Sequence, residues 1–356
     1  MNATKDDQTS ARASNRSIVK ALAYISAAVI ALLPPLTAAA EPATLKLSFP
    51  SSDRSLGYLT LVEPFVDAIN DDRRGLLKIV VYFSGSLGTP ADQPQLVADG
   101  KADIALVLPG FDSKRFPDEA AIELPGLFRD AREASLVHTR LAAEDALRGF
   151  RDFFVIGAVA TQPESIDSRK RIASLADLKG QTLRVNNPID VVAMGKLGAA
   201  AKVMSLVHTA NAINSGAVDG AVLELAQLFD FGVGRMVSHH YLLPVGSAPL
   251  ALVMNRKVFD NLPEAAKTLI RDHSGVWLAE RYAKTSGAIS QRVLKQLRAD
   301  PRRTVTVPTP ADLATAQRAF KAVADDWAAK SSRNEGLLAL VKSEIAKLRS
   351  SKETRP

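Results

Sequence analysis

The chain has 356 residues, no cysteine and a formal net charge of +7 at pH 7. This length allows about two domains and enough buried surface for a core without disulfides. The absence of cysteine excludes thiol nucleophiles, iron–sulfur clusters and cysteine-ligated zinc. Lysine and arginine are scattered and only 6% of the residues are aromatic, which argues against a nucleic-acid-binding surface.

The first 40 residues predict a secretory signal. A polar, mainly basic stretch precedes the apolar run Ala21–Leu33, two prolines interrupt it, and Ala38–Ala40 offers the small residues that a signal peptidase needs. The alternative is a membrane anchor, because residues 21–40 are nearly long enough to span a bilayer. A lipoprotein would need a cysteine at the cleavage site. We therefore expect Sec-dependent export and release into a periplasm.

Short apolar runs alternate with amphipathic segments along the next two hundred residues. Runs short enough for strands are Leu45–Phe49, Leu77–Phe83, Ile104–Leu108, Phe154–Val159, Thr182–Val185, Gly220–Leu225 and Leu250–Asn255. Segments with helical periodicity are Gly57–Asn70, Asp92–Asp99, Ala131–Phe150, Ile189–Leu197 and Ala210–Ser215. This alternation predicts an α/β fold.

The last third of the chain is predicted to be mainly helical. A long helical pattern covers Ala265–Leu297, with glycines 275 and 287 as candidate bends. A short strand, Thr304–Val307, precedes two further helices, Pro310–Ala329 and Glu335–Arg349. Residues 351–356 are expected to fray.

Two passages, Val97–Ala105 and Ile213–Ala221, repeat one pattern. In each, a helix runs into a glycine that can adopt the left-handed conformation typical of helix ends, and an aspartate three residues later begins a strand. Two lobes built from similar units would produce this repeat, and so would the chance recurrence of common turn chemistry.

Arg184 lies at the end of the strand-like run Thr182–Val185 and precedes the turn formers Asn186–Pro188. A guanidinium at the end of a strand can offer two parallel hydrogen bonds to a carboxylate. A surface arginine or a structural ion pair would fit the same position.

Several short motifs occur in a fixed order around this arginine and beyond it. They are Asp177–Gly180, Leu183–Val185, Leu197–Ala199, Ser215–Gly220, Ile122–Phe128 and Val253–Asn255. Together they resemble the solute-binding proteins of TRAP transporters (DctP type), and the resemblance covers roughly Ala43 to Leu348. It implies a two-lobe periplasmic binding protein of type II-like fold, with an inter-lobe cleft, strands that cross between the lobes and a long C-terminal helix.

The same resemblance implies how the chain divides. Residues 41–160 with about 250–288 would form the first lobe, and residues 161–249 with about 289–350 would form the second. Arg184 would then pair with the carboxylate of an organic acid. Further ligand-binding candidates, taken by position, are Asn187, Met204, Leu206, Leu223, Gln162, Ser51, Ser52 and Leu108.

Simpler roles compete for most of these candidates. The side chains of Met204, Leu206 and Leu108 fit a plain apolar core equally well, and Ser51 and Ser52 fit a helix cap. Leu223 stands where many family members carry an asparagine. This departure favours a less polar ligand, or a different polar partner such as Glu224.

The resemblance implies a periplasmic receptor that delivers a small organic anion to a membrane-embedded TRAP permease. We expect a monomer that needs no cofactor or metal, and pairing through the long helix from Ala265 is the alternative. No HExxH spacing, nucleophile elbow or Walker loop indicates an enzyme. Unpaired buried polar groups are costly, so the apolar candidates favour a dicarboxylate, keto acid or aromatic acid over a sugar acid. The alternatives are a sensor of the same fold, a periplasmic enzyme, or a purely structural role.

Overall fold

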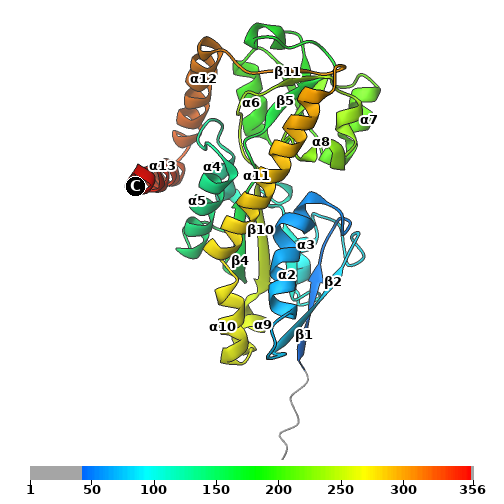
Figure 1. Cartoon of the computed structure of the whole chain (residues 1–356). Coiled ribbons are helices and arrows are strands. Elements are labelled where there is room, and N and C mark those ends of the chain that lie inside the picture. The colour runs from blue at the N-terminus through cyan, green and yellow to red at the C-terminus, as the bar shows by residue number, and fades with distance from the viewer. Residues whose placement is uncertain (1–41, 354–356) are drawn as a thin grey trace, which may run out of the picture. The chain divides into compact units, whose positions relative to one another are not determined.

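The strands form two mixed sheets (Figure 1). The computed structural model describes residues 42–353, so the predicted signal segment 1–40 lies outside the described residues. Sheet A contains β1 (Ala43–Ser48), β2 (Leu77–Tyr82), β3 (Ile104–Val107), β4 (Phe153–Ala160) and β10 (Pro249–Asn255). Sheet B contains β5 (Ser165–Ser168), β6 (Thr182–Val185), β7 (Ala200–Val203), β8 (Gly220–Leu223), β9 (His239–Tyr241) and β11 (Thr304–Thr306).

The two sheets share one topology. Sheet A has the order β2-β1-β3-β10-β4, and sheet B has the order β11-β9-β5-β8-β6-β7. In sheet A, β1 is parallel to β2 and β3, and β10 is antiparallel to β3 and β4. In sheet B, β6 is parallel to β7 and β8, and β5 is antiparallel to β8 and β9. Five strands of sheet B therefore have the same order and relative directions as the strands of sheet A. This arrangement confirms the predicted two-lobe α/β fold. We call the parts built on sheets A and B the first and second lobes.

Helices connect the strands and cover the sheets. A π-helical turn, η1 (Tyr58–Val62), continues into α2 (Glu63–Asn70). The other helices are α3 (Gln93–Ala98), α4 (Ala120–Glu123), α5 (Ala131–Ala143), α6 (Pro188–Lys196), α7 (Thr209–Asn214), α8 (Gln227–Asp230), α9 (Arg256–Asn261), α10 (Glu264–Asp272), α11 (Val276–Ala299), α12 (Pro310–Ala328) and α13 (Ser332–Glu353). None of the helices within residues 42–353 has the length and apolar character needed to cross a membrane.

Two sequence expectations about helices need correction. The pattern over Ala265–Leu297 forms two helices, because Gly275 has φ +60° and separates α10 from α11. Gly287 lies inside α11 without breaking it. The helix predicted over Ala131–Phe150 ends at Ala143, and Asp145 follows with φ +52°.

The repeated glycine–aspartate pattern has the same structure in both lobes. Gly100 and Gly216 have φ +70° and +79° after α3 and α7. Asp103 Oδ2 then accepts a 2.7 Å hydrogen bond from the first-lobe Lys46 N–H. Asp219 Oδ2 likewise accepts a 2.9 Å bond from Thr182 N–H. Each aspartate thus holds the neighbouring parallel strand in register, so the repeat is structural.

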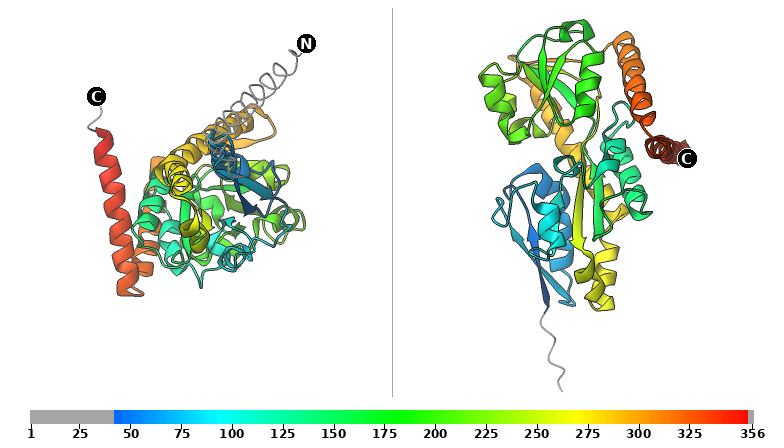
Figure 2. Two further views of the ribbon diagram at one scale, coloured as in Figure 1. Left: turned by 90° about the horizontal axis from the view of Figure 1, so that it is seen from below. Right: turned by 180° about the vertical axis from the view of Figure 1, so that it is seen from behind.

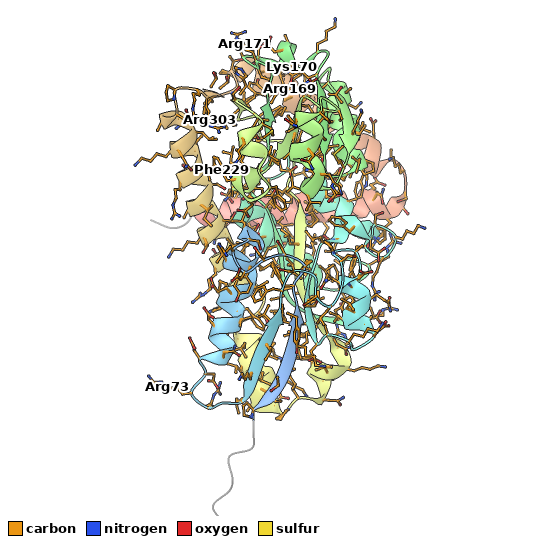
Figure 3. All side chains as sticks on the ribbon, turned by 90° about the vertical axis from the view of Figure 1, so that its right-hand side faces the viewer. Arg73, Arg169, Lys170, Arg171, Phe229 and Arg303 are labelled. Atoms are coloured by element: carbon orange, nitrogen blue, oxygen red, sulfur yellow. The ribbon has the colours of Figure 1, made fainter. Side chains whose placement is uncertain are left out.

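Charged side chains surround the second of these aspartates. Arg169 and Lys170, labelled near the top of Figure 3, place side-chain nitrogens 3.2 Å and 2.9 Å from the Asp219 carboxylate. The aspartate therefore links the turn after β5 to the start of β6.

The chain passes between the lobes at residues 161–164, at residues 242–248 and along α11 (Figure 1). The first two segments are hydrogen bonded to each other. Thr161 N–H donates to the carbonyl of Ala248 at 3.0 Å, and Glu164 N–H donates to the carbonyl of Gly246 at 2.8 Å. Helix α11 contacts α5 and β4 of the first lobe and β11 of the second. We call residues 161–164 and 242–248 the crossing segments.

The last two helices also join both lobes (Figure 2). Helix α12 packs on α6 through Ala316, Phe320 and Val323 in the second-lobe core. Helix α13 packs on α4 and α5, and its apolar side chains belong to the first-lobe core. The sequence analysis assigned residues 289–350 to the second lobe. In the structure, α13 packs against the first lobe instead.

Candidate functional site

Arg184 is a buried residue, only 2% exposed, in the middle of the second lobe. Its neighbours Leu183 and Val185 point into the apolar core of the lobe, and because successive side chains of a strand alternate, Arg184 lies on the other face. Its Nε donates to the carbonyl of Met204 at 2.8 Å, and its Nη1 donates to that of Val222 at 3.4 Å. These bonds fix the guanidinium plane, so the surface-arginine interpretation is wrong.

Two buried carboxylates act on this guanidinium. Glu164, 2% exposed, comes from the first crossing segment, and Asp190, 1% exposed, comes from the first turn of α6. Burial lowers the pKa of Arg184, and the charges of both acids oppose that change. Burial, with the charge of Asp190, raises the pKa of Glu164 well above its ordinary value. Burial also raises the pKa of Asp190 to about 7.

Asn187 places Asp190. It is the N-cap residue of α6, and its Oδ1 accepts a 2.9 Å hydrogen bond from Asp190 N–H. The Asp190 carboxylate in turn accepts from the backbone N–H groups of Asn186 and Asn187, a reciprocal cap of the kind that begins many helices. Asp190 Oδ1 is buried and has no hydrogen-bond partner among the described residues. Asn187 therefore caps the N-terminus of α6, and Oδ1 of the Asp190 carboxylate is left without a hydrogen-bond partner.

Glu164 and Glu123 approach Asp190 from other elements. Asn186 Nδ2 donates to Glu164 Oε1 at 2.5 Å. A Cβ on Gly246 would lie 3.0 Å from the carbonyl oxygen of Glu123 and 3.7 Å from Asp190 Oδ1, so this glycine permits the close approach. Burial, then the charge of Asp190, raises the pKa of Glu123 to about 8. The site thus contains several acids and one arginine.

Glu224 is hydrogen bonded to α11, although its charge also acts on Glu164. It follows β8, is 0% exposed, and its Oε1 accepts hydrogen bonds from Ser286 Oγ at 2.8 Å and Ser290 Oγ at 3.4 Å on α11. It also accepts from the backbone N–H of Gln162, and burial raises its pKa to about 7. Glu224 therefore links β8, a crossing segment and α11, and in this structure it replaces no polar partner beside Arg184.

The apolar candidates of the second lobe lie in its core. Leu223 is 0% exposed within an apolar cluster, and the side chains of Met204 and Leu206 pack against that cluster. The carbonyl of Met204 nevertheless reaches Arg184 directly. Their side chains contribute packing here, and ligand contact by these residues stays a prediction.

The remaining candidates lie on the crossing segment and the first lobe. Gln162 Oε1 accepts from Ala131 N–H at 3.0 Å, at the start of α5. Ser51, Ser52 and Leu108 follow β1 and β3, whose carboxyl ends form one edge of sheet A. Ser51 and Ser52 use their backbone carbonyls to accept from Ser84 and Ser55. The structure therefore brings Arg184, Asn187 and Met204 together, with the first-lobe candidates on the other sheet.

A cavity of about 420 Å³ opens beside the crossing segments. Its lining includes Gln162, Glu164, Pro244, Gly287 and Arg129. Glu164, whose charge acts on Arg184, is therefore also one of the residues that line this cavity. Residues 42–353 contain no group of three or more His, Cys, Asp or Glu side chains arranged to hold a metal ion.

Glu164 and Asp190 were missed from the sequence. Asp190 had a readable signal, since Asn187-Pro188 followed by an acid two residues later is a typical helix start. Glu164 had none, because its proximity to Arg184 depends on how the crossing segment is placed.

Two sheets of the same order, joined by crossing segments beside a buried arginine, define the class of two-lobe α/β solute-binding proteins. Residues 50–331 match the family model described as bacterial extracellular solute-binding protein, family 7. The chain therefore belongs to this family.

Similar proteins of known sequence or structure agree with the family. A solute-binding protein of Sulfitobacter sp. (strain NAS-14.1) is 24% identical over 276 residues, which are 75% of this chain and 83% of that protein. A marine-metagenome TRAP solute-binding protein in complex with 3-hydroxybenzoate has a TM-score of 0.79 at 22% identity, covering 86% of this chain and 99% of that chain. One from Rhodoferax ferrireducens in complex with copurified benzoate has a TM-score of 0.77 at 23% identity, covering 87% and 99%.

Proposed function

We propose that this protein is an extracytoplasmic receptor that binds a small organic acid between its lobes and delivers it to a TRAP-type transporter. The observation that carries the proposal is Arg184, a buried guanidinium fixed by two backbone carbonyls on the face of β6 away from the core. A fixed guanidinium binds a carboxylate with little loss of side-chain entropy.

The ligand is a carboxylate with a largely apolar body. The second lobe has Leu223 buried in its apolar cluster where a polar residue was expected, so this position offers a ligand no polar partner. Two similar structures hold 3-hydroxybenzoate and benzoate. Because buried polar groups need partners, this surrounding favours an aromatic or short aliphatic acid over a polyhydroxylated one.

Delivery follows from closure of the lobes. A ligand that contacts both lobes stabilises the closed state by its differential affinity for that state. A membrane-embedded permease can then recognise the closed, loaded receptor in the periplasm. The receptor acts as a monomer, performs no covalent chemistry and needs no cofactor.

The test is calorimetric titration of the parent, Arg184→Lys and Arg184→Gln with benzoate and 3-hydroxybenzoate. Lysine keeps the charge but loses the planar pair of donors, so we expect at least tenfold weaker binding. Glutamine should abolish detectable binding. Arg318→Gln on the exposed face of α12 is the matched control, and circular dichroism checks folding of each variant. Unchanged affinity in both folded Arg184 variants would overturn the proposal, and turnover of the bound acid would indicate an enzyme.

A further inference from the structure

Basic side chains gather at one edge of sheet B. Strands β5, β9 and β11 are neighbours there, and Ser168, His239 and Thr304 lie side by side in the sheet. The chain carries cations just beyond each of these three positions, so residues that are far apart in the sequence form one surface (Figure 3). We call this surface the basic edge, and it consists of Arg169, Lys170, Arg171, Arg235, Arg302 and Arg303.

Backbone hydrogen bonds hold the three segments of the basic edge together. Ser238 N–H donates to the carbonyl of Ser168 at 3.1 Å, and Thr304 N–H donates to the carbonyl of Ser238 at 2.8 Å. The Arg303 guanidinium donates to the carbonyls of Val237 at 3.0 Å and Gly234 at 2.6 Å. The positions of the basic residues relative to one another are therefore set by the fold.

The acids at this edge are fewer than the cations. Asp219 and Asp300 each lie within 3.2 Å of side-chain nitrogens from two residues of the basic edge. Arg171 and Arg235 are exposed, and neither forms an ion pair with any of residues 42–353. Two carboxylates thus serve four cations, and two further guanidinium groups face solvent without a carboxylate.

Two other acids nearby do not change this balance. Asp167 is 0% exposed and lies 2.6 Å from His240, so it faces the interior. Asp177 accepts hydrogen bonds from backbone amides at the start of its own helical turn, and the exposed Lys179 follows two residues later. The surface of this edge therefore keeps a net positive charge.

The basic edge lies at the opposite end of the strands from the candidate ligand site. Thr182, at the start of β6, is bound to Asp219, whereas Arg184 and Asn187 follow toward the other end of that strand. A partner on the basic edge therefore leaves the approach to Arg184 open.

We propose that the basic edge binds the anionic phospholipid surface of the membrane beside which the receptor works. Guanidinium groups spread over three chain segments fit several lipid phosphates at once, each with paired hydrogen bonds. Phe229 is 41% exposed, and its ring centre is 5.8 Å from the guanidinium carbon of Arg303. An exposed aromatic ring beside basic residues is typical of a lipid–water interface. This inference goes beyond the proposed function and does not depend on Arg184.

The test measures sedimentation of the protein purified from the periplasm with vesicles of two compositions. One contains equal parts of phosphatidylglycerol and phosphatidylcholine, and the other contains phosphatidylcholine alone. We expect at least tenfold stronger binding to the anionic vesicles at low salt. This preference should decline as sodium chloride is raised from about 0.05 M to about 0.5 M, because salt screens exposed charges. Binding to phosphatidylcholine alone would reveal attachment by other means, including residues 1–40.

A pair of double variants assigns the binding to the basic edge. Arg171→Gln with Arg235→Gln removes two cations that have no ion pair to lose, and it should weaken binding to anionic vesicles at least fivefold. The control is Arg73→Gln with Lys78→Gln in the first lobe, which removes the same charge from exposed residues that also form no ion pair within residues 42–353. The control should bind like the parent. Circular dichroism and benzoate affinity should be unchanged in both double variants.

Equal binding of the parent to the two kinds of vesicle would overturn this inference, and so would equal loss of binding in the two folded double variants. Binding to permease in neutral lipid discs that needs Arg171 and Arg235, without binding to anionic vesicles, would also overturn it and indicate an acidic protein surface as the partner. Arg184→Gln should bind anionic vesicles as the parent does. Failure of the proposed function would therefore leave vesicle binding intact, and failure of vesicle binding would leave benzoate affinity intact.

Discussion

The carboxylate of Asp230 accepts a hydrogen bond of 2.8 Å from the backbone N–H of Leu56. Asp230 ends α8 in the second lobe, and Leu56 begins the helical segment of the first lobe that continues as η1 and α2. First-turn amides have no partner within their own helix, and aspartate is a common partner for them. Here that partner comes from the other lobe, so separation of the lobes would break the bond.

Asp230→Ala should therefore favour the open arrangement. Loss of a helix-capping bond costs about 1 kcal/mol, which corresponds to roughly fivefold weaker binding of benzoate if closure is required. Small-angle scattering should show a larger radius of gyration for the variant without ligand. Asp53→Ala, an exposed site in the loop before Leu56, is the matched control. Equal scattering and affinity for Asp230→Ala and the parent would contradict this role.

Glu224→Gln should stabilise the protein at neutral and higher pH. Burial raises the pKa of Glu224 to about 7, from an unfolded value near 4.5. A raised carboxyl pKa means that the folded state holds the proton more strongly. The parent therefore loses stability as pH rises from about 4.5 to about 7, and ionised Glu224 costs up to about 3 kcal/mol above that range.

Urea unfolding at several pH values measures this difference. The gain from Glu224→Gln should be near zero below about pH 4.5 and should grow as pH rises to about 7. Exposed Glu144→Gln should show no such trend. A gain that does not depend on pH would argue against titration of Glu224 as the cause.

Removal of either repeated aspartate should weaken its own lobe. Asp103→Ala and Asp219→Ala leave the amides of Lys46 and Thr182 without their carboxylate acceptors. We expect a cost of about 1–3 kcal/mol for the part-buried Thr182 bond and a smaller cost for the exposed Lys46 bond, where water can replace the carboxylate. Asp→Asn keeps an acceptor oxygen and should cost less. Thermal unfolding measures both, with exposed Asp99→Ala as the control. If the alanine and asparagine variants lose the same stability at both sites, the hydrogen bonds that the aspartates accept do not contribute to stability.

Substitution by alanine should lower the stability of the protein at one glycine and raise it at another. Gly220 lies in β8, where a Cβ would be 2.2 Å from the carbonyl oxygen of Asp167 on β5, so Gly220→Ala must push two strands apart. We expect a loss of more than about 3 kcal/mol. Gly195 in α6 has open space around its Cβ position, and Gly195→Ala should gain about 0.5–1 kcal/mol. Similar unfolding midpoints for the two variants would refute the steric argument.

The sequence predicted most of the strands whose side chains are apolar and missed β5, β7 and β9. Of these, β5 and β9 carry polar side chains that are buried as a pair. The run Thr182–Val185 became β6 without change. Strand β5 is mostly polar, yet all four of its residues are buried. Its Asp167 Oδ1 lies 2.6 Å from His240 Nδ1 on β9, and Ser165 Oγ donates to the same carboxylate at 2.9 Å. Hydrophobic periodicity cannot reveal strands whose polar groups satisfy one another across the sheet.

The residues of the candidate site were also predicted only in part. Arg184 was identified because its strand, turn and neighbouring motifs are local in sequence. Its acidic neighbours come from a crossing segment and from a helix start. The proximity of Glu164 depends on the hydrogen bonds between residues 161–164 and 242–248, which are far apart along the chain. Local patterns therefore locate the arginine but not the charge balance around it.

The position of β10 has a consequence for the order of folding. In sheet A, β10 lies between β3 and β4, and no other strand joins them. The first four strands end at residue 160, but they cannot form one sheet until residues 249–255 are also available for pairing. All of β5 to β9 is made in that interval. The early half of the chain must therefore wait for the late half, and such non-local pairing slows folding.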